Sequence, residues 1–318
     1  MRVVITGGAG FIGRSLTRRL LARGEVGGDT IDEIVAFDAG NAASTEAGVV
    51  SVSGDIADRE VVAALVKGED DVVFHLASMV SGAAEEDFDR AQQVNLQGTI
   101  NVLEACRAKS GRVRLVFAST ISTFGRPNVP ESVADSTKQT PENTYGVTKA
   151  IGELLLNDYT RKGFLDGRAP RLPTVIIRPG PPNAALSGFA SAIFREPLAG
   201  VDYALPVGLD MRIPVIGELT AVAGFIALAE VNGDDLGRDR VVNLPSVSVS
   251  PREMIDALHR VAGDRTLGKV ELAYDAELDA KVAAWPHHSS FERALELSLP
   301  RDENIDSIAR AYIEEHLG

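Results

Sequence analysis

The sequence predicts an α/β fold in which a doubly wound parallel sheet is accompanied by a second, smaller mixed α/β lobe. Short, β-branched apolar runs alternate with helical patterns through the first half of the chain, as expected for a sheet covered on both faces. The runs are apolar throughout, which is typical of strands buried on both sides. Strands are predicted at 3–6, 33–38, 72–76, 115–119 and 174–178, and helices at 14–23, 58–66, 91–108 and 145–161.

Two changes in composition divide the chain into domains. Loops rich in Pro, Gly and Ala occupy 179–214, and after 251 the sequence becomes helical and charged. The helical stretch 218–229 and the strand-like 241–244 are expected to return to the parallel sheet. We therefore predict one domain at 1–178 plus 213–247 and a smaller lobe at 179–212 plus 248–318. The segment 25–30 is predicted to be a loop between the first helix and the second strand.

The composition excludes several classes of partner. The 318 residues carry 45 acidic and 32 basic side chains, a net charge of −13, which disfavours nucleic acid and anionic membranes. The N-terminal apolar run is too short for a signal peptide or a membrane span. One cysteine, Cys106, permits no intrachain disulfide, which fits the reducing cytoplasm, and its helical context predicts a small buried apolar residue.

A glycine turn follows the first strand and opens the first helix. Gly7, Gly10 and Gly13 have the spacing of a Rossmann dinucleotide site: the first permits a tight turn, the second lets the backbone approach a pyrophosphate, and the third lets helix and strand pack closely. Phe11 and Ile12 are expected to anchor the turn in the core. Amide groups at the start of the helix would face the phosphates.

Acidic residues at the ends of the next strands indicate which nucleotide is bound. Asp38 ends the second strand, where a carboxylate accepts hydrogen bonds from the adenosine ribose and repels a 2′-phosphate. Ala39 follows it instead of a basic residue, so NAD is favoured over NADP. Asp55 and Ile56 follow another apolar run and are predicted to lie near the adenine.

The end of the strand predicted at 72–76 carries residues that would allow a cofactor to approach closely. These residues are Leu76, Ala77 and Ser78. His75 precedes them inside the strand run, so a structural role is favoured over a catalytic one.

Tyr145 and Lys149 lie one helical turn apart, and this pair indicates hydride chemistry on the bound dinucleotide. A phenol titrates near pH ~10 in water and is a poor base at neutral pH unless a nearby cation favours the phenolate. Lys149, at i+4 on the same helix face, is placed to act in this way.

These motifs resemble the extended short-chain dehydrogenase/reductase family, which includes nucleotide-sugar epimerases and dehydratases. The matching stretches are 7–13, Asn95 within Val-Asn-Leu-Gln-Gly-Thr, 117–125, 145–149, and Ile-Arg-Pro-Gly at 177–180, which includes Pro179. The resemblance implies an NAD-binding first domain, a substrate-binding smaller lobe, and cofactor contacts from Asn95, Tyr145, Lys149 and Pro179. Asn95 is expected to support its helix and a water path more than the chemistry itself.

The resemblance also assigns catalytic roles. Counting back five residues from Gly125 gives Thr120, the hydroxyl implied to hold the reacting oxygen. Ser119 is implied to contact the nicotinamide or the substrate. Tyr145 would remove the alcohol proton while Lys149 holds the nicotinamide ribose and lowers the phenol pKa.

Stretches farther along the chain are similar to a narrower group of this family, the D-erythronate dehydrogenases. They lie at 149–159, 161–167, 171–174, 178–191 and 194–200. This similarity implies that NAD oxidises the C2 hydroxyl of a four-carbon sugar acid, D-erythronate, to the 2-keto acid. A short polyhydroxy carboxylate needs cations and several hydroxyl partners. Besides Ser119, Thr120 and Tyr145, the candidates are Ser81, Asn183, Ser187, Phe189, Arg195 and Arg212.

Alternative functions remain open from the sequence alone. A nucleotide-sugar 4-epimerase or dehydratase would use the same Tyr, Lys and Thr, and a non-catalytic NAD(P)-sensing module would need none of them to react. No metal is predicted, because His287 and His288 have no partner at ligand spacing. The helices from 91 and from 145 carry apolar residues on more than one face, including Leu103, Leu154, Leu155 and Tyr159, which predicts a homodimer.

Overall fold

A computed structural model describes residues 1–40, 46–109, 113–125, 130–182 and 184–318. The chain forms two compact units. The first unit comprises Met1–Thr120, Asn143–Arg171 and Val222–Val242, and the second comprises Ile121–Glu142, Leu172–Ala221 and Asn243–Gly318. The second unit contains 121–142, 172–178, 213–221 and 243–247, which the sequence-based prediction had placed in the first domain.

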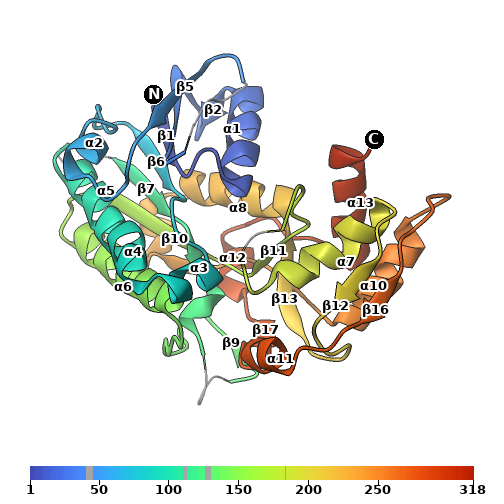
Figure 1. Ribbon diagram of the computed structural model, residues 1–318. Helices are drawn as coiled ribbons and strands as arrows, with labels where there is room; N and C mark the ends of the chain where they lie inside the picture. Colours follow the sequence, from blue (N-terminus) through green and yellow to red (C-terminus); the bar gives the residue numbers. More distant parts are fainter. Residues whose placement is uncertain (41–45, 110–112, 126–129, 183) are drawn as a thin grey trace. The chain divides into compact units, whose positions relative to one another are not determined.

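A parallel sheet forms the first unit, in the strand order β14-β10-β7-β6-β1-β4-β5, with the short strand β8 paired to β10 (Figure 1). The neighbours from β10 to β5 pair in parallel. The order reverses between β1 and β6, and ligands of doubly wound sheets bind at the carboxyl ends of strands beside such a reversal. The predicted doubly wound fold is confirmed. The strands are β1 (Arg2–Thr6), β4 (Glu33–Asp38), β5 (Val49–Ser53), β6 (Val72–His75), β7 (Arg114–Phe117), β8 (Ser119–Thr120), β10 (Asp166–Leu172) and β14 (Val241–Asn243).

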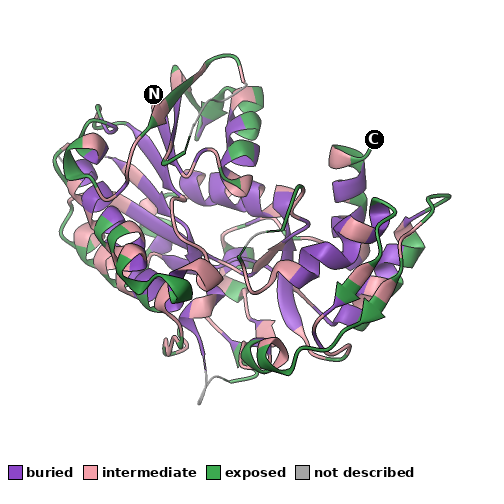
Figure 2. Cartoon of the chain, viewed as in Figure 1, coloured by how far each residue is buried: buried purple, intermediate pink, exposed green. Residues whose placement is uncertain are grey.

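Helices cover both faces of this sheet, with α5 and α6 on one face and α1 and α8 on the other (Figure 1). Figure 2 shows the central strands as buried and the edge strand β5 as largely exposed, and Val4, Val35, Phe37 and Leu115 pack with apolar residues of α2, α5 and α6. The helices of this unit are α1 (Phe11–Arg23), α2 (Arg59–Ala63), α3 (Ser81–Glu86), α4 (Phe88–Ala91), a π-helical turn (Gln92–Gln97), α5 (Gly98–Arg107), α6 (Thr144–Arg161), α8 (Glu218–Glu230, which begins in the second unit) and α9 (Gly233–Leu236).

The segment predicted as a loop at 25–30 is a β-hairpin. Its strands are β2 (Glu25–Val26) and β3 (Asp29–Thr30), which pair antiparallel. Gly27 and Gly28 connect them with φ values of +63° and +85°. Two-residue hairpins favour turns with positive φ at both central positions, a conformation that glycine adopts without a steric penalty.

Strand β10 was not predicted, because its sequence is polar and contains a proline. Its residue Arg168 is fully buried and ion-paired with Asp166. The guanidinium Nη1 also donates to the carbonyl oxygens of Leu228 (3.1 Å), Ala229 (3.0 Å) and Val231 (2.7 Å), where α8 ends. The stretch predicted as a strand of the main sheet at 174–178 instead begins β11 of the second unit. The carbonyl groups at the end of α8 therefore allow the charged strand β10 to be buried.

The second unit is mixed α/β, as predicted. A small sheet pairs β13 with β11 in parallel and with β15 antiparallel, and α7, α10 and α13 contribute to a core that includes Phe194, Met254 and Ile308. The strands are β9 (Ser132–Val133), β11 (Thr174–Ile176), β12 (Tyr203–Leu205), β13 (Ile213–Gly217), β15 (Val247–Val249), β16 (Val270–Leu272) and β17 (His288–Ser289). The helices are a 3-10 turn (Ile121–Thr123), α7 (Gly188–Leu198), α10 (Pro251–Val261), α11 (Ala276–Val282), α12 (Glu292–Glu296) and α13 (Ile305–His316).

Arg168→Ala is expected to lower the free energy of unfolding by about 3–5 kcal/mol, because the substitution removes a fully buried side chain and leaves the carbonyl groups at the end of α8 without their donor, while Asp166 keeps its pairing with Arg240 at 3.1 Å. Urea titration followed by circular dichroism measures the change. Arg161→Ala is the matched control: its ion pair with Asp158 is exposed, and its loss should cost roughly 0–1 kcal/mol. Equal stability losses in the two variants would contradict the assigned role.

Candidate active site

The glycine turn after β1 lies against the end of β6. Gly7 has φ of +74°, and a Cβ atom on it would lie 2.8 Å from the backbone nitrogen of Ala77. A Cβ on Gly13 would lie 2.2 Å from the carbonyl oxygen of Gly7. Side chains at these positions would therefore push the turn away from the sheet and from the start of α1. The contacts require glycine at the tight turn of Gly7 and at the close approach of Gly13 to that turn.

The start of α1 suits a phosphate group. Gly10 is its N-cap and makes no side-chain capping bond, so the first amides of the helix are not covered by a capping side chain. Helix N-termini of this kind bind anions through their amide groups and the helix dipole. Phe11 and Ile12 are half-buried rather than part of the core, which differs from the anchoring predicted for them.

Asp38 ends β4 beside the glycine turn. Its Oδ2 accepts a hydrogen bond from the Ala9 amide at 3.0 Å, and the Gly8 amide donates to the Phe37 carbonyl at 3.0 Å. The carboxylate is only half-buried. A partly exposed acid in this position fits the ribose of NAD and opposes the extra phosphate of NADP.

Asp55 and Ile56, which were predicted to lie near the adenine, contact side chains and backbone of the first unit. Asp55 forms an ion pair with Arg90 at 2.9 Å, and its pKa is lowered chiefly by a hydrogen bond from the Ala57 amide. Ile56 is buried against Gly98, where an added Cβ would meet its side chain at 2.8 Å. The Ile56 side chain therefore serves the core between the sheet and α5.

A buried network lies beneath the end of β6. His75 bonds to Thr6 through Nδ1 at 2.7 Å and to Thr99 through Nε2 at 3.1 Å. Burial lowers the pKa of His75 to about 3, so the ring is neutral. His75 thus has the structural role predicted for it. Next along the chain, Leu76 is half-buried, like Ala77 and Ser78.

Asn95 lies in the π-helical turn at Gln92–Gln97, where the sequence predicted regular α-helix. Its amide group pairs with the backbone of Met79: Oδ1 accepts from the Met79 nitrogen at 2.7 Å and Nδ2 donates to the Met79 oxygen at 3.2 Å. π-helical turns are frequent at functional sites. Asn95 therefore fixes the chain at Met79, directly after residues 76–78 that follow β6.

The structure brings Tyr145, Lys149 and Thr120 together in the first unit. Asn143 caps the start of α6 by accepting a hydrogen bond from the Gly146 amide at 2.7 Å. Tyr145 and Thr120 are joined by a side-chain hydrogen bond. The ammonium of Lys149 lies 5.7 Å from the centre of the Tyr145 ring. These are the groups that a reaction at an alcohol requires.

The predicted lowering of the phenol pKa is not found in this structure. Burial raises the pKa of Tyr145 to about 12, although its hydrogen bond with Thr120 acts in the opposite direction. Burial also lowers the pKa of Lys149 to about 7, against the opposing effect of the negative charge of Glu153. The Lys149 ammonium donates to the Ala118 carbonyl at 2.9 Å and lies 4.8 Å from the Phe117 ring centre. For Tyr145, desolvation therefore outweighs the hydrogen bond with Thr120, and for Lys149 it outweighs the negative charge of Glu153.

Ser119 is not directed at the reacting groups. It is fully buried, and its hydroxyl donates to the carboxylate of Glu153. Arg171 makes two hydrogen bonds to the same carboxylate, from Nε at 2.9 Å and from Nη2 at 2.8 Å. Neither Glu153 nor Arg171 was predicted from the sequence as a residue of the site. The i+4 step from Lys149 could have revealed Glu153, whereas no local pattern identifies Arg171.

The predicted substrate residues are divided between the units. Ser81 begins α3 of the first unit and is half-buried, whereas Asn183 lies outside the described residues. Pro179 belongs to the second unit and is half-buried, as are Ser187 and Arg212. Phe189 is buried in the core of that unit, so its side chain packs rather than faces a ligand.

Both candidate arginines of the second unit already pair with carboxylates. Arg195 bonds to Glu196 through Nε (2.9 Å) and Nη2 (2.6 Å). Arg212 bonds to Glu253 at 3.2 Å and to the Ser248 carbonyl at 2.6 Å. A substrate carboxylate would have to share these cations with the acidic residues.

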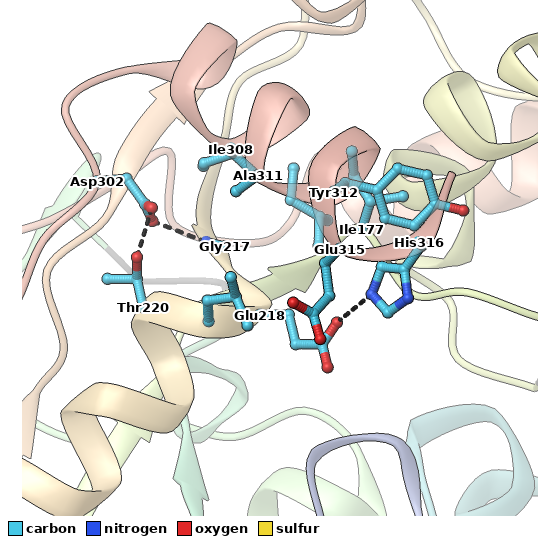
Figure 3. A pocket seen from close by; sticks show the side chains of 12 residues that line it. Ile177, Gly217, Glu218, Thr220, Asp302, Ile308, Ala311, Tyr312, Glu315 and His316 are labelled. Atoms are coloured by element: carbon cyan, nitrogen blue, oxygen red, sulfur yellow. Dashed lines mark hydrogen bonds and ion pairs between the residues drawn. The ribbon is translucent and has the colours of Figure 1, made fainter. Parts of the chain in front are cut away.

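A small pocket in the second unit contains none of the predicted site residues (Figure 3). Asp302 accepts hydrogen bonds there from the Gly217 amide at 2.8 Å and from the Thr220 hydroxyl at 2.6 Å. His316 of α13 bonds to Glu218 at 3.1 Å. The pocket lies where α13 packs against the start of α8, and its polar contacts hold these two helices together.

Among the residues that the structure describes, no group of three or more His, Cys, Asp or Glu side chains is placed to hold a metal ion. His288 lies in β17, which pairs with β9. Within the same described ranges, no helix combines the length and the hydropathy needed to span a membrane.

The glycine turn at the sheet reversal and the Tyr145, Lys149 and Thr120 cluster define a Rossmann-type oxidoreductase that binds a nicotinamide dinucleotide. Residues 3–226 match the NAD dependent epimerase/dehydratase family, and the chain belongs to that family.

Individual relatives match nearly the whole chain. A D-erythronate dehydrogenase from Cupriavidus necator is 43% identical and covers 99% of this chain and 98% of its own length. A D-erythronate dehydrogenase from Haemophilus influenzae is 39% identical and covers 99% of each chain. A crystal structure described as a nucleoside-diphosphate-sugar epimerase from Agrobacterium tumefaciens has a TM-score of 0.94 and 37% identity, with 100% of this chain and 95% of that chain covered.

Tyr145→Phe is expected to lower the rate of alcohol oxidation at least ~100-fold while NAD still binds, because the substitution removes only the hydroxyl that bonds to Thr120. Stopped-flow absorbance measures the rate and calorimetry the NAD affinity. Tyr159→Phe, on the same helix, is the control, since its hydroxyl bonds to Glu104. An unchanged rate in Tyr145→Phe would rule out the assigned base, whereas NAD binding without alcohol oxidation in the wild type would favour a non-catalytic sensing module.

Proposed function

We propose that the protein oxidises the C2 hydroxyl of D-erythronate to 2-keto-D-erythronate with NAD. The observation that carries the proposal is the hydrogen-bonded Tyr145 and Thr120 pair, with the Lys149 ammonium 5.7 Å from the Tyr145 ring centre. The two curated relatives named for this activity support the substrate, because they match the chain over nearly its full length.

The residues of the first unit have distinct tasks in this reaction. When bound, NAD supplies the acceptor for the hydride that leaves carbon 2 of the substrate. The amides at the start of α1 hold the pyrophosphate and Asp38 holds the adenosine ribose. Thr120 orients the substrate hydroxyl, and Tyr145 takes its proton, so that the alcohol carbon becomes a ketone. Lys149 would bind the nicotinamide ribose, and its positive charge would stabilise the phenolate of Tyr145.

Binding of a short sugar acid depends on a few charge-assisted contacts. We propose Ser81, Ser187, Arg195 and Arg212 as contacts of the substrate. Phe189 is buried in the core of the second unit, so its proposed role is to pack beneath the loop that precedes α7. Arg195 and Arg212 are already paired with Glu196 and Glu253, so the substrate carboxylate would bind each of them in competition with an acidic side chain.

A nucleotide-sugar epimerase is the second candidate. The observation that favours it is the 37% identity and TM-score of 0.94 to the Agrobacterium structure of that description. An epimerase uses the same three residues but regenerates NAD in each cycle, so it produces no net NADH.

We also propose that the chain forms a homodimer in the cytoplasm. Val147 and Leu154 of α6 lie seven residues apart on one helix face and are 37% and 65% exposed, with half-buried Ile151 between them. A second copy of the chain would cover this stripe. By contrast, Leu103 is buried, Leu155 is half-buried, and Tyr159 bonds to Glu104. The cytoplasmic location is supported by the presence of one cysteine in the sequence.

Purified protein incubated with NAD and D-erythronate is expected to produce NADH in proportion to the keto acid formed, because oxidation releases the reduced cofactor. Absorbance at about 340 nm follows NADH, and a panel of four- and five-carbon aldonates tests the choice of acid. Turnover of a nucleotide sugar without net NADH, combined with silence toward every aldonate, would instead support the epimerase.

Leu154→Glu is expected to convert the dimer to a monomer, since the substitution places a charge in the proposed apolar interface. Light scattering coupled to size-exclusion chromatography measures the mass. Leu272→Glu is the matched control: Leu272 is 56% exposed in the second unit, and its substitution should leave the mass unchanged. A monomeric wild-type protein would refute the dimer.

A further inference from the structure

Three successive residues after β7 each bond to a different residue of α6. The Ala118 carbonyl accepts from the Lys149 ammonium at 2.9 Å, the Ser119 hydroxyl donates to Glu153, and Thr120 is hydrogen-bonded to Tyr145. Tyr145, Lys149 and Glu153 follow one another at i+4 spacing and therefore lie on one face of the helix. The catalytic groups and Glu153 belong to one continuous set of contacts.

Glu153 is the most firmly held member of this set. It is 2% exposed, and Arg171 is 4% exposed, so the carboxylate and guanidinium meet away from solvent. Their two hydrogen bonds of 2.9 and 2.8 Å have the bidentate geometry that fixes both groups in one orientation. Arg171 lies in β10, which also pairs with β8, the strand of Ser119 and Thr120. Glu153 thus links the helix that carries the base to both strands beside it.

We propose that Glu153, clamped by Arg171, is a positioning residue of the reaction centre: its carboxylate holds β8 against α6 and supplies the negative charge that keeps Lys149 an ammonium. Ser119 serves this contact instead of touching the substrate. The inference rests on the proposed function, alcohol oxidation at Tyr145, for its kinetic consequence.

The charges around Lys149 explain why this carboxylate matters. Burial lowers the pKa of Lys149 to about 7, and Glu153 is the group that opposes this effect. The other titratable groups facing Lys149 are Tyr145 on α6 and His75 on β6, and His75 is neutral because burial lowers its pKa to about 3. Without the carboxylate, the buried Lys149 ammonium would lose the negative charge that opposes its desolvation.

The direction of the effect follows from this arrangement. Removing the charge of Glu153 lowers the pKa of Lys149 further, so the lysine becomes neutral at neutral pH. A neutral lysine no longer favours the phenolate, and a higher pH is then needed to remove the Tyr145 proton. A residue that only supported the fold would change stability without moving the lysine titration.

The direct test is nuclear magnetic resonance of protein labelled with 13Cε-lysine, without added nucleotide. Lys149→Met assigns the Lys149 signal, and its titration is compared in wild type and Glu153→Gln. We expect the pKa of Lys149 to fall by about one unit or more in Glu153→Gln. Glu230→Gln, which removes a carboxylate paired with Arg23 at 2.6 Å, is the matched control and should leave the titration unchanged.

A second variant controls for misfolding of Glu153→Gln. Glu153→Gln removes the negative charge that pairs with Arg171, so the double variant Glu153→Gln, Arg171→Met removes both buried charges and is expected to fold more readily. The pKa of Lys149 should again lie below that of wild type. An unchanged or raised pKa of Lys149 in the folded variants would overturn the proposal.

Kinetics provide the second readout. The rate of oxidation should rise with pH as Tyr145 loses its proton, and in Glu153→Gln this rise should shift upward by about one pH unit, a roughly tenfold loss of kcat near neutral pH. KM should change little, because Glu153 does not touch the substrate. An unshifted pH profile would overturn the proposal. If D-erythronate were not oxidised even by wild type, the proposed function would fail while a lowered Lys149 pKa would still support the role of Glu153.

Discussion

The attachment of α6 to the residues that follow β7 is the constraint on which the rest of the active site depends. A helix that only covered the sheet would need apolar contacts, such as those of Leu156 with the core. This helix also presents a phenol, an ammonium and a carboxylate to 118–120, and each bonds to a different residue there. The position of the base is therefore set by several hydrogen bonds at once, and not by the rotamer of Tyr145 alone.

Burial of these groups opposes the chemistry that they perform. It raises the pKa of Tyr145 and lowers the pKa of Lys149, so each group is driven toward its neutral form. A general base at neutral pH needs the opposite for the phenol. The charge that counters desolvation comes from Glu153, itself held by Arg171. The pairing of Glu153 with Arg171 therefore affects both the burial of these charges and the reactivity of Tyr145.

Buried arginines recur in the structure for a common physical reason. Arg168 and Arg171 both lie in β10, and each is held by a carboxylate: Arg168 by Asp166 and Arg171 by Glu153. A guanidinium can satisfy several acceptors at once, which makes it the cation best suited to the interior of a protein. One of these arginines joins the sheet to the end of α8 and the other joins it to the catalytic helix. A single polar strand therefore serves both the fold and the site.

The sequence by itself determined the doubly wound sheet, the glycine turn, Asp38 and the spacing of Tyr145 and Lys149, because each depends on local periodicity or on residues close together in the chain. It did not reveal β10, whose charged side chains are buried only because α8 and α6 supply their partners. The resemblance implied that Ser119 contacts the nicotinamide or the substrate, and only the fold shows that its hydroxyl bonds to Glu153. Tertiary structure decided which polar residues are paired and how far burial moves their pKa values, because both depend on neighbours distant in the sequence.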